Sequence, residues 1–113
     1  MSFKFPVINP LLHNDLRLKI MVALDSLESA DFVFLCSITD STRGNLSVQI
    51  KNLQEAGYLD VSKSGLGRLS HTVCRITGKG REALRVYEQG LRRLFAEGVP
   101  ASEDGQEAQQ SAS

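Results

Sequence analysis

The first part of the chain carries apolar residues at helical spacing. The stripe consists of Leu12, Leu16, Ile20, Ala23, Leu24 and Leu27. The dipeptide Asn9-Pro10 is one start signal and Asn14 is another, so we expect a helix that begins at residue 10 or 15 and ends at residue 27. Three further apolar residues lie outside the stripe, namely Leu18, Met21 and Val22. A helix that is apolar on more than one side is covered on more than one side, here either by its own core or by a partner subunit.

Two more helices are predicted next along the chain. Asp31 is a suitable N-cap for the first of them, from Phe32 to Ile38, because its carboxylate can accept from free backbone N–H groups. The inward-facing residues of this short helix are expected to be Phe32, Leu35 and Ile38. After a polar turn, Ser41 or Thr42 caps a longer helix that ends near Ala56.

The pattern changes from helical to extended after Gly57, which stands where a left-handed residue ends a helix. Residues 58–64 and 69–76 are rich in β-branched and aromatic side chains and predict two strands. A short glycine-rich turn joins them, so the pair is expected to form a hairpin. Thr77 then caps a last helix over residues 78–97, whose stripe is Leu84, Tyr87, Leu91, Leu94 and Phe95.

Length and composition indicate a single small domain without a membrane anchor. The chain has 113 residues, and no stretch approaches the roughly 20 apolar residues of a membrane span. Residues 1–14 contain one lysine and no apolar run of signal-peptide length, so we expect a cytoplasmic protein. The two cysteines, Cys36 and Cys74, do not form a disulfide framework and agree with that expectation.

The net charge of zero conceals an uneven distribution. Seven basic and three acidic residues fall between Thr39 and Arg81, which gives this segment a net charge of +4. Residues 98–113 carry three acidic and no basic side chains and almost no apolar ones, so they are expected to form a disordered tail. The basic segment favours a polyanionic partner, although many surfaces that bind none have a similar charge.

The order of helix, short helix, helix, hairpin and helix has a known counterpart. Residues 44–59, GNLSVQIKNLQEAGYL, resemble the recognition helix of MarR-like and ArsR-like winged-helix regulators. Residues 76–81, ITGKGR, resemble the Leu-Thr-x-x-Gly-Arg/Lys junction that follows their hairpin, or wing. The resemblance covers roughly residues 9–94. It implies a mainly α winged helix-turn-helix domain over residues 9–97, and a homodimeric, sequence-specific transcriptional regulator of double-stranded DNA.

The third helix has an inner and an outer face. Leu46, Ile50 and Leu53 cluster at 100° per residue and define the core side. On the outer side Gly44 permits close backbone approach, and Val48 suits contact with a thymine methyl group. We therefore expect residues of about 42–56 to enter the major groove and the wing, about 59–76, to meet the flank. The candidate DNA-binding residues are Thr42, Arg43, Gly44, Asn45, Ser47, Val48, Lys51, Lys63 and Arg68.

Nothing in the sequence indicates an enzyme, a cofactor or a metal site. His13 and His71 stand in no catalytic motif, and the glycines belong to turns. Cys36 and Cys74 lack the close-spaced Cys or His partners of zinc sites, so buried structural cysteines are favoured over a metal or redox sensor. The sequence identifies no small-molecule effector. The alternative function is that of a winged-helix subunit that binds proteins and not DNA, which the near-neutral charge favours.

Both ends of the domain carry apolar residues beyond the needs of a small core. We expect residues 1–8 and the end of the last helix to form a two-fold dimer interface, because symmetric dimers are the commonest assembly. The candidate interface residues are Phe3, Phe5, Leu12, Leu91, Leu94 and Phe95.

Overall fold

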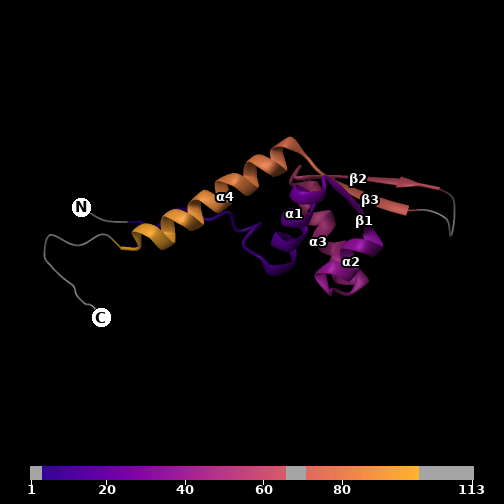
Figure 1. Ribbon diagram of the computed structural model, residues 1–113, viewed down its shortest axis with the longest axis horizontal. Coiled ribbons are helices and arrows are strands. Elements are labelled where there is room, and N and C mark those ends of the chain that lie inside the picture. The colour runs from indigo at the N-terminus through magenta and orange to yellow at the C-terminus, as the bar shows by residue number, and fades with distance from the viewer. Residues whose placement is uncertain (1–3, 66–70, 100–113) are drawn as a thin grey trace, which may run out of the picture.

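A computed structural model describes residues 4–65 and 71–99. The elements are α1 (Asp15–Leu27), β1 (Ser29–Asp31), α2 (Phe32–Thr39), α3 (Arg43–Glu55), β2 (Leu59–Ser64), β3 (His71–Ile76) and α4 (Gly78–Glu97). Helices α1, α2 and α3 form a cluster, the β2–β3 hairpin leaves it on one side, and α4 extends as an arm on the other (Figure 1). The cluster therefore lies between two projecting elements.

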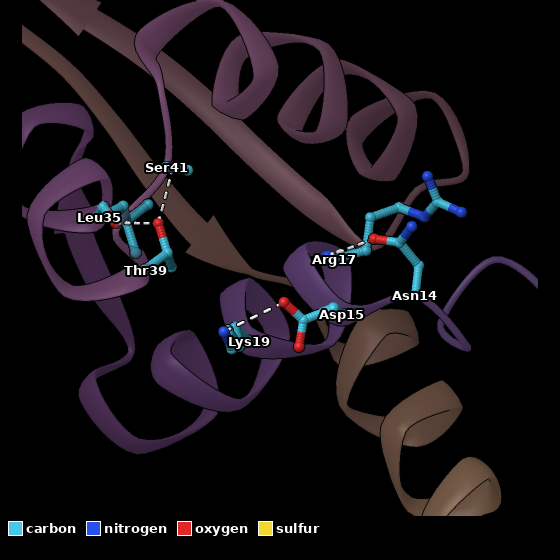
Figure 2. A network of polar contacts seen from close by, with 7 residues as sticks. All are labelled: Asn14, Asp15, Arg17, Lys19, Leu35, Thr39 and Ser41. Carbon is cyan, nitrogen blue, oxygen red and sulfur yellow. Dashed lines mark hydrogen bonds and ion pairs between the residues drawn. The ribbon is translucent and has the colours of Figure 1, made fainter.

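Each helix begins at a side chain that accepts a backbone N–H of its first turn. The four caps are Asn14, Asp31, Thr42 and Thr77. Asn14 Oδ1 lies 2.9 Å from the amide nitrogen of Arg17 (Figure 2), so α1 starts at Asp15 and not at Pro10. Thr42, not Ser41, caps α3. These caps confirm the predicted helix starts. The starts could be predicted because capping depends only on residues within one turn.

The sheet has three antiparallel strands in the order β1–β3–β2, where the sequence predicted a two-stranded hairpin. The added strand β1 pairs with β3 over the register Ser29↔Arg75 to Asp31↔Val73. Three residues between two helices are too short to show the alternation that marks a strand. The hairpin itself is confirmed, with β2 paired to β3 from Leu59↔Ile76 to Ser64↔His71. Of the predicted second strand, residues 69 and 70 lie outside the described residues.

One core joins the three clustered helices, the sheet and the first half of α4. Its buried side chains are Leu12, Leu16, Ile20, Met21, Leu24, Leu35, Leu46, Ile50, Leu53, Leu59, Cys74, Ile76, Leu84 and Tyr87. The predicted stripes supply most of this list. Leu27 belongs to the predicted stripe of α1 but is not buried, since it lies at the end of the helix and is 47% exposed.

The inward face of α2 differs from the prediction. Leu35 is fully buried and Phe32 packs against the core, but Ile38 is 48% exposed. Thr39 is buried instead, one helical turn after Leu35. Its hydroxyl donates to the Leu35 carbonyl at 2.7 Å and lies 2.8 Å from Ser41 Oγ (Figure 2). These bonds satisfy the polar atom of Thr39 inside the core, which hydrophobic periodicity alone does not anticipate.

Gly57 ends α3 in the left-handed conformation that the sequence predicted, with φ of +84°. Its amide donates to the Gln54 carbonyl, and the Tyr58 amide donates to the Leu53 carbonyl, the pair of bonds that defines a Schellman motif. The Gly57 carbonyl accepts from the Thr77 hydroxyl at 2.7 Å. The end of α3 is thereby tied to the start of α4.

The segment after the hairpin is held by close backbone contact and by charge. A Cβ atom at Gly80 would lie 2.3 Å from the Tyr58 carbonyl oxygen, so only glycine fits there. The next residue, Arg81, donates to the Asp25 carboxylate at 2.6 Å. Thr77, Gly80 and Arg81 of the ITGKGR segment therefore each make a contact that fixes the start of α4 against the rest of the domain.

Candidate nucleic-acid interface

The outward face of α3 matches the expectation from sequence. Leu46, Ile50 and Leu53 are buried. Every predicted DNA-contacting residue at the N-terminal end and on the outer side of this helix is exposed, namely Thr42, Arg43, Gly44, Asn45, Ser47, Val48 and Lys51. Val48 is 55% exposed on this face, where its side chain is accessible to a partner.

The basic side chains differ in whether a carboxylate accompanies them. On the other faces of the described structure, carboxylates within 4.0 Å pair with Lys19, Arg81, Arg85, Arg92 and Arg93. Within residues 4–65 and 71–99, by contrast, no carboxylate pairs with Arg43, Lys51 or Lys63. The Arg43 guanidinium lies 5.9 Å from the centre of the Phe32 ring, a cation–π contact that holds it beside α2. Three of the predicted DNA contacts, Arg43, Lys51 and Lys63, are therefore without a carboxylate partner in the described part of the chain, although the whole chain is neutral.

A cleft of about 380 Å³ is lined by the first half of α3 and by the hairpin. Arg43 and Ser47 of α3 line it together with His71 and Thr72 of β3. Lys63 is the β2 residue directly opposite Thr72 in the strand register. The structure thus brings the hairpin candidate Lys63 near the α3 candidates. Arg68, the other predicted hairpin residue, lies outside the described residues.

A polar network inside this face was not anticipated from the sequence. The Arg17 guanidinium of α1 donates to the Gln49 side-chain carbonyl, and Gln49 Nε2 donates to Asn45 Oδ1 at 3.2 Å. Asn52 Nδ2 also donates to Gln49, at 3.3 Å. The spacing of residues 45, 49 and 52 on one helix signals their contact. No sequence signal connects them to Arg17, which lies 32 residues before Gln49.

The cysteines have structural surroundings. Cys74 is fully buried, and burial raises the pKa of its thiol to about 11. Cys36 is half-buried, and its thiol donates to the Ser41 carbonyl at 3.0 Å. His13 makes a hydrogen bond with the Tyr87 hydroxyl at 2.9 Å. Among the described residues no three His, Cys, Asp or Glu side chains gather as metal ligands would.

The predicted dimer residues fall into distinct environments. Phe5 is 55% and Phe95 83% exposed, while Leu91 and Leu94 are half-buried along α4. Leu12 is 0% exposed, so its assignment to a dimer surface was wrong: the core of its own subunit covers it completely. Phe3 lies outside the described residues.

The fold and site together define a winged helix-turn-helix. Helices α2 and α3 enclose a tight polar turn, and the β2–β3 hairpin, the wing, projects directly after them (Figure 1). The family model described as a winged helix DNA-binding domain matches residues 16–95, and the chain belongs to this family. The family is one of DNA-binding domains and not of enzymes, in agreement with the sequence analysis. None of the described helices is long and apolar enough to cross a membrane.

Three relatives illustrate the match. An uncharacterized protein of Methanocaldococcus jannaschii is 35% identical over 78 residues, which cover 69% of this chain and 85% of that protein. A transcriptional regulator homologue from Pyrococcus horikoshii OT3 superposes with a TM-score of 0.71 at 29% identity, over 76% of this chain and 85% of that one. A MarR family regulator from Silicibacter pomeroyi, with a TM-score of 0.60 and 16% identity over 80% and 62% of the two chains, shares the fold. The predicted winged-helix class is confirmed by the family match, and the MarR family regulator shows the same fold.

Proposed function

We propose that this protein is a sequence-specific transcriptional regulator that places α3 in the major groove of double-stranded DNA and the wing on the flank. The observation that carries the proposal is the outer face of α3, where unpaired Arg43 and Lys51 accompany exposed polar side chains. The solvated duplex presents a dense line of phosphate charge that such cations neutralise with release of counterions. The family match supports this function.

The proposed contacts divide between base edges and phosphates. Asn45, Ser47 and Val48 lie in the N-terminal half of α3, the part of a recognition helix that meets base edges. Thr42, Arg43 and Gly44 lie at the entrance of that helix. We assign Lys51, one turn deeper, and the wing residues Lys63 and Arg68 to phosphates. Base contacts specify sequence, while phosphate contacts mainly add affinity.

Substitution of single side chains tests this division. Selection from a random duplex pool first yields the preferred site. Asn45→Ala is expected to cost about 1–3 kcal/mol on that site and to relax the preference at one base pair. Lys51→Ala is expected to weaken specific and nonspecific duplexes alike and to lower the salt slope by about one unit.

Lys19→Ala is the matched control, because Lys19 is exposed but pairs with Asp15 on α1. It is expected to bind as the wild type does. If Asn45→Ala and Lys51→Ala also bind as the wild type does, α3 does not present the DNA-binding face.

The arm formed by α4 supports a homodimer. Phe5 and Phe95 are exposed, and Ile8 packs against Gly90, so the N-terminal segment runs along the outer half of α4. We propose that a second copy of the chain covers these side chains with Leu91 and Leu94 about a two-fold axis.

Sedimentation is expected to give about twice the 12.4 kDa chain mass. Phe95→Lys is expected to yield monomers and Phe34→Lys, at an exposed phenylalanine of α2, is not. A monomeric wild type refutes the dimer.

A protein-binding subunit is the second candidate. The observation in its favour is an apolar groove of about 450 Å³ between α1 and α2, where Val22 and Ile38 are half-exposed. Filter binding with nonspecific duplex at low salt separates the two functions. A wild type that retains no duplex under these conditions favours the protein-binding subunit.

A further inference from the structure

The orientation of the Asn45 amide follows from a residue on another helix. Arg17 is anchored by its Nε, which donates to the Leu11 carbonyl, and its Nη1 donates to Gln49. A guanidinium has five N–H donors and no acceptor. The Gln49 atom that meets Arg17 therefore has to be the side-chain oxygen. Asn52 Nδ2, also a donor, meets the same oxygen.

The orientation of the Gln49 amide in turn fixes the orientation of the Asn45 amide on the same helix. With its oxygen held by Arg17, Gln49 turns its amide nitrogen toward Asn45, and only an oxygen can accept there. Asn45 thus directs Oδ1 toward Gln49. In the described part of the chain its Nδ2 group meets no acceptor and stays available on the exposed face.

The free group decides which bases suit Asn45. An asparagine that reads adenine uses both ends of its amide, because adenine presents the N7 acceptor beside the N6 donor. Guanine presents two acceptors in the major groove, N7 and O6, and thymine presents O4. An amide whose oxygen is already engaged can still donate to adenine N7, but it leaves the adjacent N6 donor without an acceptor. At guanine and thymine the same amide meets only acceptors.

We infer that Arg17 and Gln49 act as positioning residues that make Asn45 a hydrogen-bond donor to guanine or thymine. The inference rests on the proposed function, since it requires α3 to lie in the major groove. It adds the class of base that is read and two residues that decide it without touching DNA.

Gln49→Glu tests the inference by reversing the polarity of the network. A carboxylate still accepts from Arg17 and Asn52, but it has no donor for Asn45. The Asn45 amide is then expected to turn its Nδ2 toward residue 49 and to present Oδ1 to the DNA. The measurement is the relative affinity for the four bases at the position where Asn45→Ala relaxes the preference.

The wild type is expected to prefer guanine or thymine there by about fivefold, the factor associated with one hydrogen bond. Gln49→Glu is expected to prefer adenine or cytosine, which offer N6 and N4 donors, by a similar factor. Gln54→Glu is the matched control, because it adds the same charge at an exposed position of α3 outside the network. It is expected to keep the wild-type preference.

Arg17→Met removes the donor that sets the polarity and is expected to bring the ratio between the bases close to one. This variant decides the question if circular dichroism shows that Gln49→Glu is unfolded. A purely structural role would change melting temperature and all affinities together without reversing the ratio.

Three results overturn the inference. The first is a wild type that prefers adenine at the Asn45 position, and the second is a Gln49→Glu variant that keeps the preference for guanine or thymine. Both leave the proposed function intact, because the protein still selects a site. The third is a wild type that selects no duplex at all, which refutes the proposed function and the inference with it.

Discussion

Alanine at position 44 is expected to separate the stability of the fold from its affinity for DNA. Gly44 is the second residue of α3, and a Cβ atom there meets no heavy atom within 4 Å. Its φ is not positive, so alanine adopts the same backbone without strain. Glycine costs a helix roughly 0.5–1 kcal/mol relative to alanine. Gly44→Ala is therefore expected to raise the free energy of unfolding by about that amount and the melting temperature by roughly 2–8 °C.

The same methyl group is expected to weaken DNA binding. Gly44 is exposed on the face that the proposed complex turns toward the duplex. A methyl group that holds this backbone away from DNA removes at least one hydrogen bond to a charged phosphate, which contributes about 1.5–3 kcal/mol. The expected loss of affinity is about ten- to hundredfold.

Gly78→Ala is the matched control for both measurements. Gly78 is the first residue of α4, is exposed, and also has no heavy atom within 4 Å of a Cβ atom. Urea unfolding is expected to show both variants more stable than the wild type, and fluorescence anisotropy titration is expected to show weaker DNA binding only for Gly44→Ala. Wild-type affinity in Gly44→Ala would refute close backbone approach at this residue. A loss of stability would refute the argument from helix propensity.

Substitutions at three further residues test the packing of the fold. Gly80→Ala is expected to lower the free energy of unfolding by about 1–3 kcal/mol, because its Cβ would meet the Tyr58 carbonyl oxygen at 2.3 Å. Thr77→Ala removes both the cap of α4 and the bond to the Gly57 carbonyl and is expected to cost about 1–2 kcal/mol, whereas Thr77→Ser, which keeps the hydroxyl, retains most of the stability. The pKa of Cys74 is about 11 in the folded protein against 9.0 ordinarily, so the unfolded chain ionises first as the pH rises above 9. Chemical denaturation at pH 8–11 is expected to show a loss of up to about 1.4 kcal/mol per pH unit that is absent from Cys74→Ala, and equal slopes would contradict the burial of this thiol.

The sequence predicted the local features of the fold well and the long-range ones poorly. Caps such as Asn14 and Asp31 act within a single turn, so a few neighbouring residues are enough to predict them. Strand β1 was missed because its pairing depends on β3, more than 40 residues later in the chain. Ile38 was placed inward and is exposed, because the hydrogen bonds of Thr39 allow a polar residue to take the buried position.

The candidate site shows the same division. The outward face of α3 follows from helical periodicity, and the sequence analysis identified its exposed residues from Thr42 to Lys51. Helical periodicity does not predict which basic side chains meet a carboxylate from a distant part of the chain. Asp15 lies one helical turn from Lys19, so that pair is local, but only the folded chain brings the Asp25 carboxylate to Arg81. Composition, which sums to zero, contains no information about this arrangement.

The sequence by itself determined the helices, the hairpin, the sides of α3 and, through two short segments, the class of the domain. These properties depend on residues that are neighbours in the chain. Tertiary structure alone decided the third strand, the burial of Leu12 inside its own subunit and the contact of Arg17 with Gln49. Each of these depends on which distant elements pack together, and that choice is made by the shared core and not by any local stretch.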